Sequence, residues 1–371
     1  MVSVRRDEVE TDRTEALRET VRRAFADSTA LRIVGGDTQR GWLPEDARCR
    51  DAQPLPVAGH RGIVHFAPTE LVLTARCGTP LAEIDALLAE AGQMLPFDPP
   101  RFGPGATFGG AVAGGLAGPA RPFHGAVRDA VLGVRLLDGR GEVGRFGGEV
   151  MKNVAGYDVS RLVTGARGTL GVILEASVRV RPRPELETSR VLELGLADAL
   201  RTMTALQRRP LPLTGIAWLE GRLHLRLAGT ARGVEAAARE LGGEALAADA
   251  DFWRRLRDLR LPFFAEEGAL WRLSLPATAP QPTLPANWLL DWGGAQRWCQ
   301  TDAEPPQVFE AARAAGGHAM QLRPALQRAP VAIGLRLLGE RVRRAMDPRS
   351  ILNPGALLPE LAPEHAQQRE A

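Results

Sequence analysis

Glycine is distributed very unevenly along this chain of 371 residues. Of its 40 glycines, 18 fall between Gly103 and Gly171, in less than a fifth of the length. Glycine is unfavourable inside helices, and it is needed where the backbone takes positive φ or passes close to another group. This segment therefore cannot be a plain helical bundle, and its backbone is expected to make tight turns against another segment or a ligand.

Size and composition predict a globular protein of two domains. Hydrophobic residues make up 44% and charged residues 25%, as in folded proteins. A chain of 371 residues also exceeds what one core normally serves. The formal charge is only +3, and arginines are interspersed with acidic residues, so no basic stripe is available for nucleic acid. We therefore expect no nucleic-acid partner.

Three isolated cysteines, Cys49, Cys77 and Cys299, indicate the redox setting of the chain. Their number is odd and no Cys-x-x-Cys pair occurs, so neither an iron–sulfur cluster nor a thiolate metal site is expected. A disulfide framework is not expected either, which fits a reducing compartment. We predict no bound metal and a cytoplasmic location.

The N-terminal sequence MVSVRRDEVETDRTEALRE lacks the apolar region of a signal peptide. The longest uncharged run, FGPGATFGGAVAGGLAGPA, contains too much Gly and Pro for a helix that spans a bilayer. Any contact with the inner face of the cell membrane is therefore expected to be peripheral and made through partner subunits.

Short apolar runs predict an α+β fold. In the first half, the runs at 70–76, 130–137 and 171–184 predict strands, and an amphipathic helix is expected at 79–92. A Pro/Arg run ends the third of these strands and marks a boundary. We therefore expect a first domain at 1–182.

The second half mixes strands with helices. RLHLRLAG (222–229) alternates like a half-buried strand, and an amphipathic helix follows at 230–243. This order predicts a smaller α+β cap domain at 183–335, with a sheet covered by helices on one face. A last helix and the sequence ILNPG form a C-terminal return segment at 336–371. No internal repeat is visible.

Three phosphate-binding patterns can be compared with the chain. A Walker loop needs Lys before Ser or Thr, and the only lysine, Lys152, precedes Asn153, so that motif is absent. The nearest approach to a Rossmann fingerprint, Gly103 to Gly109, has one residue too many. LRIVGGDTQRG (31–41) fits an anion nest, with two glycines after a short strand. Taken alone this pattern is a weak signal, because a strand followed by Gly-Gly is usually an ordinary turn.

Lys152 is the only lysine among 47 basic residues. Arginine is a planar fork, whereas lysine is a compact charge on a thin stem. A retained lysine therefore suggests a place where arginine does not fit, and accidental survival under a coding bias is the alternative. Tyr157, the only tyrosine, follows five residues later.

Four segments occur in order: VGGDTQRG, GATFGGAVA, GGEVMKNVAGYDVSRLVTGARGTLGVI and MDPRSILNPG. Together they resemble the FAD-binding oxidoreductases of the vanillyl-alcohol oxidase/p-cresol methylhydroxylase (PCMH) type. Within that superfamily they resemble the FAD-binding E subunits of bacterial glycolate oxidases. The likeness is strong over 31–182, clear in the C-terminal motif and weak between them. It implies a two-part FAD-binding domain of PCMH type at 1–182.

The resemblance also implies a role for each segment. The first cradles the FAD pyrophosphate, the second wraps the cofactor, the third runs beside the flavin and its ribityl chain, and the last returns to the flavin edge. The residues expected to bind FAD are Gly35, Gly36, Asp37, Thr38, Gln39, Gly105, Ala106, Thr107, Gly109, Gly110, Asn153, Val154, Ala155, Gly156, Tyr157, Asp158, Gly165, Gly168, Thr169, Leu170, Gly171, Val172, Ile173 and Asn353.

Lys152 is the candidate for a catalytic role, as a cation beside the flavin N1/C2 carbonyl or as a contact for a substrate carboxylate. A structural ion pair with Asp158 or Glu149 is the alternative. For Tyr157 the alternative is a core ring whose hydroxyl is satisfied.

The substrate half of the family pattern is incomplete. Related flavoenzymes that act on 2-hydroxy acids carry a His-rich motif ending in Asp-Gly-Asn in the second domain. Here His224, His318 and His365 lie in no such motif, and each is expected to be an ordinary surface or core residue. The side chains that could attach a flavin covalently are also not in the expected arrangement, so non-covalent FAD is expected. They are Cys49, His60, His65 and His124.

The FAD-binding motifs are complete, whereas the substrate-binding motif is missing. This combination predicts a subunit that carries FAD within a complex. The resemblance implies oxidation of glycolate to glyoxylate, with a larger FAD-containing subunit and an iron–sulfur subunit as partners. One alternative is a self-sufficient FAD-dependent dehydrogenase of another small 2-hydroxy acid, with cap arginines holding the carboxylate. The other is a non-catalytic scaffold that FAD only stabilises.

Overall fold

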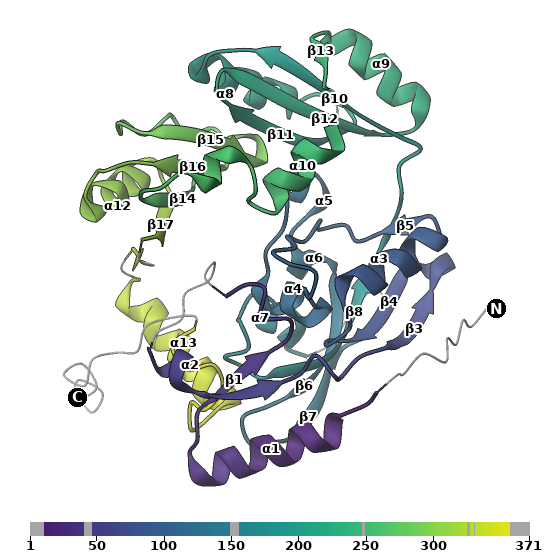
Figure 1. The fold of residues 1–371 in the computed structure, drawn as a ribbon, viewed down its shortest axis with the longest axis vertical. Helices are drawn as coiled ribbons and strands as arrows, with labels where there is room; N and C mark the ends of the chain where they lie inside the picture. Colours follow the sequence, from purple (N-terminus) through teal and green to yellow (C-terminus); the bar gives the residue numbers. More distant parts are fainter. Residues whose placement is uncertain are drawn as a thin grey trace.

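The computed structural model describes residues 11–40, 47–148, 156–246, 249–324, 327–329 and 331–356. Two antiparallel sheets organise these residues, one in each half of the chain (Figure 1). The last strand of the first half, β9 (Arg181–Pro182), pairs with β5 (Gln93–Met94). The first strand of the second sheet starts at Leu186.

The first sheet has five strands in the order β3-β4-β8-β6-β7. Helices cover one of its faces, and its largest hydrophobic core forms there, around Phe97 and Phe108. The strands are β3 (Ile63–Ala67), β4 (Val72–Arg76), β6 (Val131–Leu137), β7 (Val143–Gly147) and β8 (Val172–Arg179). The helices are η1 (Pro68–Glu70), α3 (Leu81–Glu90), α4 (Phe108–Gly114), α5 (Arg121–His124), α6 (Val127–Ala130) and α7 (Val159–Val163).

A second part of the first domain is built on the parallel pair β1 (Leu31–Val34) and β2 (Gln53–Pro56), with α1 (Thr14–Asp27) and α2 (Ala47–Asp51). Its core joins α1 to the C-terminal segment, whose Leu352 also forms a parallel bridge with Leu31. The domain therefore has two parts, as the PCMH-type resemblance implies.

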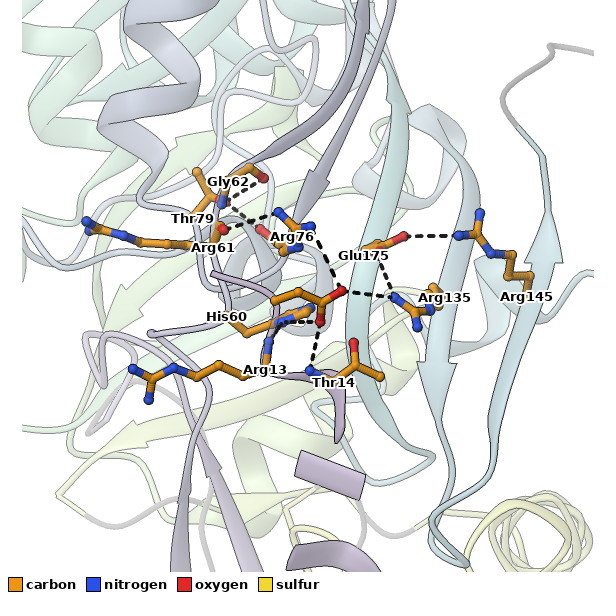
Figure 2. A network of polar contacts seen from close by, with 11 residues as sticks. Arg13, Thr14, His60, Arg61, Gly62, Arg76, Thr79, Arg135, Arg145 and Glu175 are labelled. Atoms are coloured by element: carbon orange, nitrogen blue, oxygen red, sulfur yellow. Dashed lines mark hydrogen bonds and ion pairs between the residues drawn. The ribbon is translucent and has the colours of Figure 1, made fainter. Parts of the chain in front are cut away.

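A polar network joins the start of α1 to the five-stranded sheet (Figure 2). Asp12 accepts the backbone N–H of Thr14 at 2.8 Å and lies 3.9 Å from the guanidinium groups of both Arg76 and Arg135. Glu175 of β8 is 5% exposed and pairs with Arg135 at 2.8 Å. Arg76 of β4 and Arg135 of β6 thus hold the N-terminal segment on the sheet, and Glu175 of the strand between them pairs with Arg135.

The second sheet has nine strands in the order β13-β10-β12-β11-β15-β16-β14-β17-β18. Its first half reads β10 (Leu186–Glu193), α8 (Leu196–Leu206), β11 (Leu213–Leu219), β12 (Arg222–Gly229), α9 (Ala231–Leu241) and β13 (Glu244–Ala245). Its second half reads β14 (Leu270–Ser274), β15 (Asn287–Asp291), η2 (Trp292–Gly294), β16 (Gln296–Gln300), α12 (Pro305–Ala314), β17 (His318–Arg323) and β18 (Gln327–Arg328).

Each half follows the ferredoxin-like βαββαβ pattern, and the two halves join edge to edge where β11 pairs with β15. In the second half, a loop between β14 and β15 replaces the first helix. No internal repeat was visible in the sequence, but the topology of the second domain does repeat. The repeat escapes notice because the two halves share strand order rather than residues.

Helices α8, α9 and α12 pack on one face of the nine-stranded sheet, as expected. The opposite face is also covered, which the sequence did not indicate. Helices α10 (Asp249–Arg257) and α11 (Pro262–Ala265) pack there around Trp253, Phe264 and Trp298. Helix α13 (Ile333–Met346) then leads back to the first domain. None of the helices within the described ranges is both long and apolar enough to cross a membrane.

Candidate cofactor site

A cavity lies in the first domain where four segments meet: the loop after β1, the start of α4, the turn before β8 and the C-terminal return segment. These segments are far apart in the sequence. The described residues that line the cavity are Arg32, Ile33, Gly35, Gly36, Asp37, Thr38, Gln39, Arg40, Cys49, Val57, Cys77, Leu81, Pro100, Ala106, Thr107, Gly109, Gly110, Ala111, Ala113, Gly114, Arg167, Gly168, Gly171, Val172, Ile173, Asn353 and Ala356.

The loop after β1 presents its backbone to the cavity. A Cβ on Gly36 would lie 1.6 Å from the carbonyl oxygen of Gly105, so no other residue fits there without moving the backbone. Asp37 takes a positive φ of 52°. Within the described part of the chain, the N–H groups of Gly36, Asp37 and Thr38 donate to no acceptor. Consecutive free N–H groups around a left-handed residue form the nest that binds anions.

The second wall is the start of α4. Thr107 caps this helix, and its hydroxyl accepts the N–H of Gly110 at 3.2 Å. The side chain of Gln39 crosses from the first loop and donates to the carbonyl oxygen of Gly110 at 2.8 Å. A Cβ on Gly109 would lie 2.5 Å from the Cβ of Cys77. The helix therefore lies directly against the nest loop because the contact positions carry no side chain.

The third wall is the turn before β8, held by Asn353. The Oδ1 atom of Asn353 accepts the N–H of Ile33 at 2.7 Å, and its Nδ2 donates to the carbonyl oxygen of Arg167 at 2.7 Å. Gly168 takes a φ of 74°, and a Cβ there would lie 2.8 Å from that Nδ2. Asn353 thus joins β1 to the turn before β8.

Arginine dominates the charge of the cavity wall. Arg32 and Arg40 both pair with Asp37, at 3.1 and 3.5 Å. Arg167 donates to the carbonyl oxygen of Ala356 at 2.5 Å and so ties the C-terminal segment to the wall. The described lining thus carries three guanidinium groups and one carboxylate, and this positive excess favours an anionic ligand such as a pyrophosphate.

The structure brings most of the sequence-predicted site residues together around this cavity. Gly105 lies behind the lining and touches Gly36. The remaining described candidates lie outside the lining: Gly156, Tyr157, Asp158, Gly165, Thr169 and Leu170. Lys152, Asn153, Val154 and Ala155 lie outside the described residues.

Tyr157 and Asp158 have specific surroundings. Tyr157 is 94% exposed, so the alternative of a core ring is wrong. Asp158 caps α7 by accepting the N–H of Arg161 at 3.0 Å. Gly165 donates to the carbonyl oxygen of Val112 and so places α7 against α4.

Several lining residues were not expected from the sequence, including Arg32, Cys77 and Arg167. Arg32 follows the buried Leu31 in β1, and Arg167 precedes a glycine in a glycine-rich turn, so the local sequence gave only weak signals for both. Cys77 has no sequence signal at all. Burial, and then the charge of Glu175, raise the pKa of the Cys77 thiol. It is therefore a protonated lining group and a poor nucleophile.

Among the residues that the structure describes, no histidine lines the cavity. His60 is 1% exposed, and its Nδ1 accepts the N–H of Arg13 at 3.0 Å (Figure 2). His224 stacks on Phe252 with ring centroids 4.0 Å apart, and burial lowers its pKa to about 4. Among the residues that the structure describes, no group of three or more His, Cys, Asp or Glu side chains is placed to hold a metal ion.

The geometry fits FAD on three observations. Glycines at the contact positions leave space that a Cβ would fill, the nest offers free N–H groups, and the charge of the wall is positive. FAD is a long dianionic ligand with a polar heterocycle, and these features match its pyrophosphate portion.

Sequence similarity to known proteins identifies the family of this chain. Residues 8–147 match the family described as an FAD binding domain. The glycolate oxidase subunit GlcE of Escherichia coli (strain K12) is 46% identical over 353 residues, covering 95% of this chain and 99% of that protein. The glycolate oxidase subunit GlcD of Bacillus subtilis (strain 168) is 34% identical over 126 residues, 33% of this chain and 26% of that protein.

A solved structure of alkyldihydroxyacetonephosphate synthase superposes with a TM-score of 0.62 at 14% identity, covering 92% of this chain and 75% of that one. This likeness concerns the fold alone, and it confirms the expected α+β architecture of PCMH type. FAD is confirmed as the cofactor by the family match. The chain belongs to the family of the glycolate oxidase subunit GlcE.

Proposed function

We propose that this chain is the FAD-binding subunit of a glycolate oxidase complex and takes part in the oxidation of glycolate to glyoxylate. The observation that carries the proposal is the extent of the likeness to GlcE, 46% identity across nearly the whole of both chains, together with the glycine-walled cavity. The relatives named as glycolate oxidase subunits imply partner chains. We propose a larger FAD-containing subunit and an iron–sulfur subunit.

The cavity supports a specific assignment of residues. The nest at Gly36, Asp37 and Thr38 would hold the pyrophosphate through N–H groups, and Gln39 and Thr107 would keep α4 in place beside it. The wall from Gly168 to Ile173 would lie along the rest of the cofactor. Bound there, FAD would supply hydride acceptance and onward electron transfer.

We further propose that FAD is held without a covalent bond. Cys49 and Cys77 are the thiols on the cavity wall, and the raised pKa of Cys77 keeps that sulfur protonated. Protein precipitated with acid should therefore release all its flavin into the supernatant. A flavin that stays with the protein would contradict this assignment.

Anaerobic titration with glycolate tests the function. The flavin absorbance near about 450 nm reports reduction, first in the isolated chain and then with its partner subunits. Bleaching in the complex supports the proposal, and bleaching in the isolated chain would show a self-sufficient dehydrogenase instead. A flavin that stays oxidised in an active complex would identify a scaffold, and a chain that cannot take up FAD would contradict the proposal entirely.

A further inference from the structure

The two domains meet along a seam, and a cavity of about 310 Å³ lies in it. Residues of both domains form its wall, among them His124 and Arg181 from the first domain and Thr214 and Arg226 from the second. No described residue lines both this cavity and the cofactor cavity. The seam cavity is therefore a second candidate site for a small molecule.

One short segment, 94–98, contacts His124, Arg181 and Arg226. The backbone of Arg181 pairs with the first residue of the segment in the β5–β9 ladder, and the imidazole of His124 hydrogen-bonds to the backbone of its middle residue. The guanidinium group of Arg226 lies 3.8 Å from the carboxylate of the last residue, Asp98. Five residues span at most about 18 Å. These contacts and the shared cavity place the three side chains around one space.

Most charges on the cavity wall are satisfied within the protein. Arg226 is 8% exposed, and it donates to the hydroxyl of Thr214 at 3.1 Å and to the carbonyl oxygen of the same residue at 2.9 Å. Asp98 pairs with Arg226 and with a second arginine, on α10. Glu185 accepts the first N–H of α9 at 3.0 Å, and Glu187 also interacts within the chain. The acids of the wall therefore do not need the remaining cation.

That remaining cation is Arg181. Among the described residues, its guanidinium group has no hydrogen-bond or ion-pair partner, although the side chain is half-buried. Burial lowers the pKa of Arg181, and so does the charge of Arg179. Its neighbour Arg183 differs, because it is exposed and donates to the carbonyl oxygen of Gln93 at 3.2 Å. Cations withdrawn from water are normally paired, so Arg181 lacks an anionic acceptor such as a carboxylate.

His124 lacks a donor. Its Nδ1 atom is buried and has no hydrogen-bond partner in the described part of the chain, whereas the ring donates to the backbone carbonyl of Pro96. The donating atom is therefore Nε2, and Nδ1 carries a free lone pair. Burial, and then the charges of Arg181 and Arg226, lower the pKa of His124 to about 4, so the ring is neutral near pH 7. A hydroxyl group would satisfy Nδ1.

We infer that the seam cavity binds a small 2-hydroxy carboxylate, whose carboxylate group pairs with Arg181 and whose hydroxyl group donates to Nδ1 of His124. A single ligand of this class supplies both missing partners. A simple carboxylate would lack the donor, and a neutral alcohol would lack the charge. The combination of carboxylate and hydroxyl follows from these two residues, and the choice of a 2-hydroxy acid rests on the proposed function.

The seam cavity adjoins the cofactor cavity. Asp98 lines the first and Pro100 lines the second, two residues further along the chain. Two residues span at most about 7 Å. The FAD subunit would thus hold substrate or product next to its cofactor, through residues unrelated to the His-rich motif that its sequence lacks.

The test uses the full chain loaded with FAD and the probe 2-hydroxyisobutyrate, whose hydroxyl-bearing carbon has no hydrogen to lose as hydride. Isobutyrate lacks the hydroxyl group and is the matched ligand. Calorimetric titrations give the Kd of each acid. Wild type should bind the hydroxy acid roughly 2- to 10-fold more tightly, because it gains one neutral hydrogen bond.

Three variants assign the roles. Arg181→Gln should weaken the binding of both acids about 10- to 100-fold, because a charge-assisted pair is lost. His124→Phe should remove the preference for the hydroxy acid and leave isobutyrate binding unchanged. Arg179→Gln is the control, since Arg179 ends β8, is exposed and does not line the cavity. The control should bind both acids like wild type.

Thermal unfolding separates binding from a structural role. The hydroxy acid should raise the Tm of wild type and of Arg179→Gln, and it should not raise the Tm of Arg181→Gln. Without ligand, Arg181→Gln should unfold at the wild-type Tm or above it, because the substitution breaks no pair. An Arg181→Gln protein with a lower Tm and an intact ligand shift would show that this arginine is only structural.

Four results would overturn the inference: no binding of 2-hydroxyisobutyrate by wild type, wild-type affinity in Arg181→Gln, a preference for the hydroxy acid that survives in His124→Phe, or inorganic phosphate bound as tightly with the same losses. Failure of the proposed function would be distinct. If glycolate bleaches the complex and the probe does not bind this chain, the function stands without the site. If the probe binds through both residues but glycolate never reduces the flavin, the site stands without the function.

Discussion

The side chain of Asn353 bridges two backbone segments, accepting the N–H of Ile33 at 2.7 Å and donating to the carbonyl oxygen of Arg167 at 2.7 Å. Asn353 also takes a φ of 41° and donates its own N–H to Leu31. One residue near the C-terminus therefore sets the distance between β1 and the turn before β8. It acts on the cavity by holding its walls.

Replacing Asn353 with Ala should loosen these walls. The N–H of Ile33 loses its acceptor, which should lower the free energy of unfolding by about 1–3 kcal/mol. FAD should bind more weakly because two walls of its cavity lose their connection. Urea unfolding and flavin titration measure both effects. Asn287→Ala is the matched control, since Asn287 is exposed at the start of β15. Unchanged FAD affinity in Asn353→Ala would contradict the bridging role.

Gly36→Ala should disrupt the nest. The new methyl group would lie 1.6 Å from the carbonyl oxygen of Gly105, so one of the two loops must move. Overpacking of this kind costs about 1–3 kcal/mol, and FAD should be lost on purification. Flavin content per chain is the measurement, with circular dichroism to show that the fold persists. Gly195→Ala is the control, because nothing lies within 4 Å of a Cβ there. A Gly36→Ala protein with full flavin content would refute the assignment.

Asp291 should make stability depend on pH. Burial raises the pKa of Asp291 from 3.8 to about 7, and Asp291 is 3% exposed. Between these values the folded state binds a proton that the unfolded state lacks, so the free energy of unfolding falls as pH rises from about 4 to about 7. Asp291→Asn cannot ionise, and its Oδ1 can still accept the N–H of Trp292.

We therefore expect the free energy of unfolding of Asp291→Asn to exceed that of wild type by roughly 2–4 kcal/mol at pH 8 and to match it near pH 4. Urea unfolding at both pH values measures this difference, with the exposed Asp302→Asn as control. An equal gain at both pH values would mean that ionisation of Asp291 is not the cause.

Arg257→Ala should uncouple the two domains. It removes the cation that Asp98 and Asp258 share, and Asp258 is 6% exposed, so a buried charge is left without its partner. Breaking such a pair costs about 3–5 kcal/mol. We expect a second unfolding transition and faster proteolysis at 183–185. The exposed Arg313→Ala should change neither. A single transition at the wild-type midpoint would show that the seam does not depend on Arg257.

Local sequence signals identified much of this protein. Alternation predicted β12 at 222–229, and the structure has it at Arg222–Gly229. Paired glycines after β1 indicated a nest, and the N–H groups there donate to no acceptor in the described part of the chain. These features succeed because turn geometry and strand periodicity depend on neighbouring residues. The doubled βαββαβ order escaped notice because topology leaves no local periodicity.

The sequence by itself determined where the backbone must carry no side chain, where it must turn and which segments could be strands. Only the tertiary structure decided that Asn353 contacts Ile33 and that Arg226 and Arg257 pair with Asp98. The physical reason is that these relationships join residues far apart in the chain. Their distances follow from how the two sheets and the returning C-terminus pack, and no neighbouring residue encodes that packing.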